Sequence, residues 1–369
     1  MPVEPSKDAR RVLSALATDK CVIIKGVPAS GKSLLLGEVR QLFEGAVASV
    51  AQSTPHQQVA ISEGSEMIEG LPSPDRTNRR VWQTVMNQNS RYKDFWRGTE
   101  PRHDGEPGFL LSEGILYRAN EHAKAASGTS LVTIDELNRG PAVNVFGPSI
   151  VAIEADKRAS EANEIVPART ASFELPAADG GEEDYWLSPH LYIVCAQNNA
   201  DTSVEAIDTA FLRRFVPIEL EPDSAVLVEH FGLDGTGGEL PKKAAVPADV
   251  YRAAVRAWEN VNRKLAVGAS PDFRIGHGAM INSGEEVPTD SVAEALAYVA
   301  RGWAAVDQHV GEVFYGKPDH IAEAYWVNEA GSAHPYKLAV APFADLDQVV
   351  LERQDPDLYE LLRVIASAG

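Results

Sequence analysis

The residues of this sequence best arranged for chemistry form a short loop between an apolar run and an amphipathic stretch. The loop follows Cys21 to Ile24 and has the spacing Gly-x-x-x-x-Gly-Lys-Ser. Glycines at both ends let successive backbone N–H groups face one anion, and the next helix directs its positive end there. We therefore expect nucleotide contacts from Gly26, Pro28, Ser30, Gly31, Lys32, Ser33 and Leu34. Lys32 would reach the outer phosphates and Ser33 would hold Mg²⁺. The alternative is an ordinary Gly/Pro turn between a strand and a helix.

Paired carboxylates follow a second apolar run. Leu131 to Ile134 leads directly into Asp135 and Glu136. At the carboxyl end of a strand beside a phosphate-binding loop, Asp135 would hold Mg²⁺, directly or through water. Glu136 would orient or deprotonate the attacking water. The alternative is an acidic turn after an ordinary strand, but the two motifs together favour nucleotide hydrolysis.

Two further polar groups lie farther along the chain. A third apolar run, Leu191 to Ala196, leads into Asn198, whose amide can hydrogen-bond a γ-phosphate or the attacking water. Taken alone, an asparagine after a strand is usually a turn residue. A short helix expected over Asp208 to Phe215 ends in Arg213 and Arg214. These arginines could satisfy helix carbonyls, or in a ring-forming NTPase they could reach the nucleotide of a neighbouring subunit.

The stretches between these motifs predict the elements that position them. Apolar spacing indicates helices over residues 2–20, 32–43 and 143–154. Alternation of buried strands and helices predicts an α/β fold of about four or five parallel strands, with the ligand at their carboxyl ends. Residues 53–130 have weak periodicity, so we expect a folded insertion with short elements near 80–86 and 115–126.

Helical stripes dominate the second half of the chain. Apolar residues recur at helical spacing from Val250 to Leu265 and from Val292 to Val306, and we read both stripes as core. The expected domains are therefore residues 1–222 with the nucleotide site, 223–324 as a helical lid, and 325–369 as a small C-terminal extension.

Composition restricts the class of protein. The 369 residues carry a formal net charge of −19, which argues against a broad nucleic-acid surface on this chain. No apolar segment is long enough to span a membrane, and charged residues occupy the first twenty positions instead of a signal-peptide core. We expect a cytoplasmic protein without membrane contact. Cys21 and Cys195 are expected to be buried, reduced core residues.

Taken in order, the motifs resemble those of AAA+ NTPases, and more narrowly the McrB branch, the GTPase motor of modification-dependent restriction systems. The residues that carry the resemblance are Asp135 to Gly140, Phe146 and Gly147, Glu154, Asp156 to Arg158, Asn198 to Ser203, and Asp208 to Phe215. Glu69 to Leu71 and Arg274 to His277 also match. Gln197 and Thr202 depart from the family's Met and Arg.

The resemblance implies a parallel five-stranded αβα sandwich with a helical lid, and Mg²⁺-dependent hydrolysis of GTP or ATP. It places Lys32 and Ser33 on phosphates and Mg²⁺, Asp135 and Glu136 on metal and water, and Asn198 at the γ-phosphate. Arg213 and Arg214 would act in trans, and His277 would contact the nucleotide. The family implies a hexameric ring and a McrC-like nuclease-linked partner, with DNA engaged through that partner or the pore.

Two other functions remain open from the sequence. One is a MoxR-like or dynein-related ATPase that remodels protein complexes. The other is a scaffold that binds nucleotide but barely hydrolyses it, which the threonine at position 202 keeps in consideration. The motif from Phe146 to Arg158 favours the restriction-system motor.

Overall fold

The computed structural model describes residues 5–50, 75–102, 108–200, 207–331, 334–344, 346–353 and 357–368. Residues 69–71 and Thr202, which belong to the predicted motifs, lie outside these ranges. The chain divides into two compact units. The first contains residues 1–25 and 32–219, and the second contains residues 26–31 and 220–369. Each unit has its own hydrophobic core.

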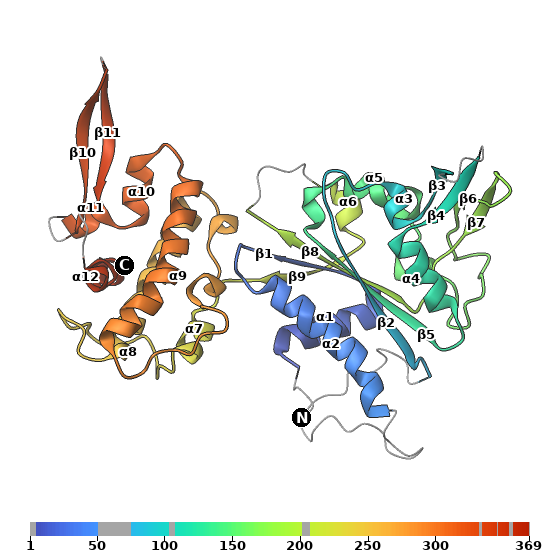
Figure 1. Cartoon of the computed structure of the whole chain (residues 1–369), viewed down its shortest axis with the longest axis horizontal. Helices are drawn as coiled ribbons and strands as arrows, with labels where there is room; N and C mark the ends of the chain where they lie inside the picture. The colour runs from blue at the N-terminus through green and yellow to red at the C-terminus, as the bar shows by residue number, and fades with distance from the viewer. Residues whose placement is uncertain are drawn as a thin grey trace. The chain divides into compact units, whose positions relative to one another are not determined.

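A five-stranded sheet forms the centre of the first unit, in the order β2-β5-β8-β1-β9 (Figure 1). The strands are β1 (Cys21–Gly26), β2 (Asn78–Val85), β5 (Gly128–Asp135), β8 (Leu191–Asn198) and β9 (Val216–Leu220). β5 pairs in parallel with β2 and with β8, its two neighbours in the sheet. With helices on both faces, this sheet confirms the predicted α/β fold.

Alternating side chains of the central strands pack on opposite faces of this sheet. On one face, Val132 and Ile134 of β5 join the core that includes α4 (Ile115–Lys124). On the other face, Phe43 of α2 (Lys32–Val50) contacts Tyr192 of β8, with ring centroids 6.0 Å apart. Burial on both faces explains why β1, β5 and β8 have continuous apolar sequences. Both cysteines are buried and free, as expected.

The edge strand β2 comes from the stretch that the sequence identified only as an insertion with short elements. Its residues alternate between exposed and partly buried, and only Trp82 is fully buried. A strand covered on one side lacks the continuous apolar run of a central strand, which is why its place in the main sheet was missed. The same region contains α3 (Tyr92–Phe95) and the hairpin of β3 (Arg97–Pro101) and β4 (Phe109–Glu113).

The helix predicted over residues 143–154 is wrong. The chain instead forms α5 (Ala142–Phe146) and two short 3₁₀ turns, η2 (Gly147–Ile150) and η3 (Ala155–Lys157). Gly147 ends α5 with a φ of 47°, a left-handed value that breaks the helix. The hairpin of β6 (Phe173–Pro176) and β7 (Glu182–Tyr185) follows. Helix α6 (Thr209–Leu212) is shorter than the helix predicted over 208–215.

Arg158 at the end of the Asp-Lys-Arg motif is fully buried. Its guanidinium donates to the carbonyls of Ile153, Ser188 and Leu191 and to the sulfur of Cys21. Burial lowers the pKa of Arg158 and raises that of the Cys21 thiol. This part of the motif therefore joins β1, β8 and the segment after α5, which is a structural role.

The second unit is mainly helical. Its helices are α7 (Ser224–His230), α8 (Pro247–Gly268), α9 (Val292–Val313), α10 (Pro318–Ala324), α11 (Val327–Ala330) and α12 (Leu358–Ala368). A hairpin of β10 (Tyr336–Phe343) and β11 (Leu346–Arg353) precedes α12. Asn260 of α8 donates to the Ile365 carbonyl at 2.8 Å, so α12 shares the core of α8. Across the described ranges, no helix is long and apolar enough to cross a membrane.

Candidate nucleotide site

The loop between β1 and α2 has the backbone shape of a phosphate cradle. Ala29 and Gly31 have φ values of 58° and 93°, and the Ser30 amide donates to the Val27 carbonyl at 3.3 Å. A Cβ at Gly26 would lie 2.6 Å from Ser30 Oγ and 2.8 Å from the Leu220 carbonyl oxygen. Glycine is therefore required at position 26 by close packing and at position 31 by the left-handed backbone.

A Gly-His-Gly turn in the second unit holds this loop. The Gly276 amide donates to the Pro28 carbonyl at 2.8 Å, and the Gly278 amide donates to the Ala29 carbonyl at 2.9 Å. A Cβ at Gly276 would lie 2.2 Å from the carbonyl carbon of Ala29. The sequence reasoning gave no role to these two glycines, although a pair of glycines around His277 is a signal of close backbone approach.

His277 lies against the same loop. Its Nδ1 accepts a hydrogen bond from the Asp223 amide at 3.3 Å, so the neutral ring carries its proton on Nε2. That Nε2 is 3.9 Å from the position that a Cβ of Gly31 would occupy. Burial lowers the pKa of His277, which favours the neutral ring. The structure thus presents one N–H donor beside Gly31.

In the first unit, Lys32 meets the end of β8. Its Nζ donates to Asn198 Oδ1 at 2.8 Å. Burial lowers the pKa of Lys32 to about 8, although the nearby carboxylates of Glu136 and Asp135 act in the opposite direction. Residues separated by more than a hundred positions are therefore brought together, as the motifs predicted.

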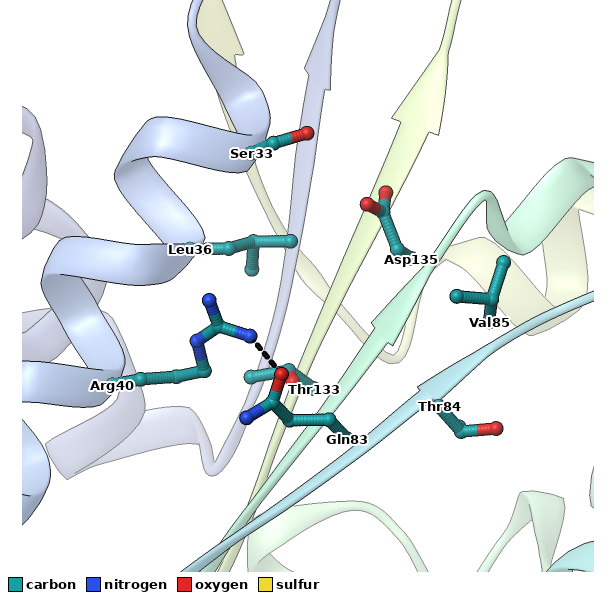
Figure 2. A pocket seen from close by; sticks show the side chains of 8 residues that line it. All are labelled: Ser33, Leu36, Arg40, Gln83, Thr84, Val85, Thr133 and Asp135. Carbon is teal, nitrogen blue, oxygen red and sulfur yellow. Dashed lines mark hydrogen bonds between the residues drawn. The ribbon is translucent and has the colours of Figure 1, made fainter.

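Ser33 and Asp135 line one cavity of about 210 Å³ between α2 and the sheet (Figure 2). Figure 2 shows their side chains at the same end of this cavity. A hydroxyl and a carboxylate are hard oxygen donors, and Mg²⁺ in nucleotide sites is commonly bound by one or two such protein ligands together with phosphates. The residues present therefore fit a Mg²⁺–nucleotide complex.

Glu136 follows Asp135 with a left-handed backbone, at a φ of 53°. Its amide donates to Asp135 Oδ1 at 2.9 Å, and its Oε2 lies 2.9 Å from Arg139 Nε. Asn138 donates from Nδ2 to the Asn198 carbonyl at 3.0 Å. Asn138 and Arg139 were part of the recognised motif, but sequence reasoning assigned neither a role. The structure shows that one fixes the end of β8 and the other pairs with Glu136.

The two arginines after α6 have different surroundings. Arg213 is exposed. The Arg214 side chain is only 9% exposed, its Nε lies 3.0 Å from Glu154 Oε1, and its guanidinium also donates to the Ala210 carbonyl. Arg214 is therefore held within its own subunit, whereas Arg213 extends into solvent.

Comparison with known proteins gives one similar curated sequence. The chain is 26% identical over 277 residues to the McrB subunit of the type IV methyl-directed restriction enzyme EcoKMcrB from Escherichia coli strain K12. The aligned part covers 74% of this chain and 50% of the relative. The chain thus spans about half the length of the relative that it matches. No family model matches the chain.

Solved structures with some likeness include a candidate ATPase from Cytophaga hutchinsonii, which is 14% identical to this chain. The match covers 86% of this chain and 78% of that chain, and its TM-score is 0.32. NtrX from Brucella abortus is 15% identical, with 87% of this chain and 66% of that chain covered and a TM-score of 0.32. NtrX has also been solved in complex with ATP; that structure has a TM-score of 0.30 at 15% identity, with 87% of this chain and 65% of that chain covered.

Proposed function

We propose that this chain is a McrB-like AAA+ protein and a Mg²⁺-dependent nucleoside triphosphatase that hydrolyses GTP or ATP; its similarity to the McrB subunit of a restriction enzyme supports this. The observation that carries the proposal is the meeting of Lys32 with Asn198, at 2.8 Å, beside the carboxylates of Asp135 and Glu136. A lysine at the start of a helix, with an amide and two carboxylates at the carboxyl ends of parallel strands, suits phosphoryl transfer to water.

Each side chain has a separate task in this proposal. Ser33 and Asp135 would hold Mg²⁺, which would neutralise charge on the phosphates. Lys32 binds the outer phosphates, and Asn198 orients the attacking water through its amide. Glu136 accepts a proton from the water while the water oxygen bonds to the γ-phosphorus. The bond between the γ-phosphorus and the oxygen that bridges it to the β-phosphate then breaks. The products are a nucleoside diphosphate and orthophosphate.

Glu136→Gln tests this function directly. The variant keeps the size and hydrogen-bonding capacity of the side chain but cannot accept the proton, so turnover should fall at least a hundredfold. Binding of a fluorescent GTP or ATP analogue should stay within about twofold. Glu360→Gln, an exposed position on α12, is the matched control. Unchanged turnover in Glu136→Gln would contradict the assignment.

We further propose that the chain is a ring-forming subunit, with a hexamer as the expected state, of a McrBC-like defence system in the cytoplasm. Similarity to a restriction-enzyme subunit supports this role, as does the exposed Arg213, which is available to a neighbouring subunit. A McrC-like nuclease-linked partner would stimulate hydrolysis, and DNA would be engaged through that partner or the pore.

The identity of the partner protein distinguishes a role in a defence system from a role in remodelling protein complexes. We expect GTP or ATP turnover to rise when the product of the adjacent gene is added, and that product to contain a nuclease-linked protein. A neighbouring von Willebrand A-domain protein that stimulates turnover would instead indicate a MoxR-like ATPase. Assays with GTP and ATP, each with and without the partner, also give the base preference.

A further inference from the structure

The cavity beside Ser33 extends well beyond the proposed metal ligands. Its wall is one face of α2, where the spacing of three and four residues places Ser33, Leu36 and Arg40 in a row. Arg40 lies seven residues after Ser33, a distance of about 10 Å along the helix. Figure 2 shows Ser33 at one end of this row and Arg40 at the other.

The floor of the cavity is the sheet. The parallel register of β2 and β5 places Gln83 beside Thr133, and Val85 beside Asp135. Thr133 and Asp135 are two positions apart on β5 and therefore face the same side. The cavity runs from Asp135, at the proposed metal end, back along the sheet to Gln83 and Thr133 near Arg40 (Figure 2).

Hydrogen-bond donors gather at this far end. The Arg40 guanidinium donates to Gln83 Oε1, which leaves the amide NH₂ of Gln83 as a donor. A guanidinium has five N–H donors, so Arg40 keeps others for a ligand. Arg40 is the one cationic residue among the eight that line the cavity. The ligand chemistry that fits is a small anion with several acceptor oxygens.

Size restricts the ligand further. Since one water in the liquid occupies about 30 Å³, the cavity of 210 Å³ has room for about seven waters. That volume accepts a tetrahedral oxyanion with part of its hydration, but not a second nucleotide. Guanidinium and phosphate form bidentate, charge-assisted hydrogen bonds, the strongest class available to such an anion.

We propose that this cavity receives the orthophosphate released by hydrolysis at the Ser33 and Asp135 end, and that Arg40 binds it before it leaves the protein. The proposal rests on the proposed nucleotidase function, because hydrolysis supplies the anion at the Ser33 and Asp135 end of the cavity. Arg40 is thereby a product-binding residue with no part in proton transfer.

Inhibition by added inorganic phosphate is the first test. In Arg40→Gln, the inhibition constant for orthophosphate should rise about tenfold, because a charge-assisted hydrogen bond is lost. Arg11→Gln, which removes an equal charge from an exposed pair with Asp8 on α1 (Lys7–Asp19), should leave the constant unchanged. Potassium chloride at matched ionic strength controls for salt. An inhibition constant within twofold of the original in Arg40→Gln would overturn the proposal.

A single-turnover experiment separates product phosphate from phosphate taken up from solution. Cleavage is followed by acid quench and release by a fluorescent phosphate-binding protein. Release should lag behind cleavage in the original chain, and the lag should shorten in Arg40→Gln but not in Arg11→Gln. An equal lag in all three proteins would show that product does not pass through this cavity.

A second variant and a direct binding measurement test the anion site if Arg40→Gln does not fold or if the chain does not hydrolyse nucleotide. If Arg40→Gln does not fold, Arg40→Lys keeps the charge but loses the bidentate geometry and should give an intermediate inhibition constant. If the chain hydrolyses neither GTP nor ATP, the nucleotidase proposal fails, while calorimetric titration with inorganic phosphate still tests the cavity. Phosphate heats that are equal in the original and Arg40→Lys proteins would refute the anion site itself.

Discussion

At the residue scale, the proposed role of Glu136 depends on how its carboxylate and backbone are held. Its carboxylate is paired with Arg139 at 2.9 Å, and its backbone has a left-handed φ of 53°. Such backbone values in non-glycine residues cost roughly 1–3 kcal/mol and persist where the surroundings enforce them. In the proposed mechanism, this pair orients the carboxylate that accepts a proton from water, since Arg139 Nε contacts Oε2 of Glu136.

The two arginines after α6 should respond differently to substitution. Arg214→Ala breaks a mostly buried ion pair with Glu154 and should lower the free energy of unfolding by about 1–3 kcal/mol. Arg213 is exposed, so Arg213→Ala should change the free energy of unfolding by less than about 0.5 kcal/mol. This variant should nevertheless lose activity. Thermal unfolding and turnover measured on both variants distinguish the roles.

Mixed assemblies test whether Arg213 acts in trans. Lys32→Ala subunits retain Arg213, and Arg213→Ala subunits retain the phosphate-binding lysine. Mixing the two inactive variants should restore part of the activity, because some interfaces would combine an intact lysine with an intact arginine. A mixture as inactive as its components would count against a shared site.

Lys32 predicts an upper pH limit for the free enzyme. Its pKa is lowered to about 8, so the ammonium that we propose binds phosphates is lost as pH rises through 8. The value of kcat/KM reports groups of the free enzyme and should therefore fall above pH 8. In Lys32→Arg, which stays charged, any remaining kcat/KM should not fall in this range. A flat profile to pH 9.5 in the original chain would contradict the prediction.

At the scale of elements, the contact between the predicted phosphate loop and the Gly276 to Gly278 turn is sensitive to change. The two backbone hydrogen bonds of 2.8 and 2.9 Å leave no space for a side chain at Gly276. Any substitution there must move Pro28 or Ala29, which lie inside the predicted nucleotide loop. The sequence could not show this, because the contact joins residues far apart in the chain.

Gly276→Ala should therefore weaken nucleotide binding at least tenfold, since its Cβ would lie 2.2 Å from a backbone carbon of Ala29. The matched control is Gly311→Ala in α9, where a Cβ has open space. That variant should bind nucleotide normally and gain about 0.5–1 kcal/mol of stability from helix propensity. Binding of a fluorescent nucleotide to both variants checks the prediction, which fails if Gly276→Ala binds as well as Gly311→Ala.

Strands that are buried on both faces could be predicted from the sequence, whereas the half-exposed edge strand could not. The buried strands β1, β5 and β8 were found from apolar runs; the loop after β1 gave Lys32, and the ends of β5 and β8 gave Asp135 and Asn198. The edge strand β2 was not placed in the sheet, because a half-exposed strand alternates. The helix expected over 143–154 failed at Gly147, whose left-handed backbone does not interrupt the apolar spacing around it. The ion pair of Glu136 with Arg139 depends on the backbone angles at these residues, which cannot be inferred from the pattern of apolar and polar residues.

At the scale of the whole molecule, burial of histidines makes stability depend on pH. Burial lowers the pKa of five histidines: His122, His190, His230, His277 and His334. Unfolding restores their ordinary pKa, so the unfolded chain binds more protons near pH 6. Their contribution to stability is complete above about pH 6.5 and is lost as pH falls through the lowered values.

The melting temperature should therefore be lower at pH 5.5 than at pH 7.5. His334 is 2% exposed and accepts a hydrogen bond from the Tyr336 amide at 2.9 Å through Nδ1. In His334→Asn, whose amide oxygen can replace that acceptor, the loss between these pH values should be smaller. Calorimetry at both pH values compares the two proteins, and an equal loss would exclude His334 as a contributor.

Arg158 has a consequence for how the first unit assembles. Its guanidinium takes carbonyl partners from two segments, at residue 153 and at residues 188 and 191, and also contacts Cys21 of β1. A guanidinium with only some of these partners would be buried at a large cost, so partly docked arrangements are unfavourable. The segment after α5 and the start of β8 should therefore join β1 in one cooperative step, so that the sheet under the proposed nucleotide site forms only when Arg158 has all its partners.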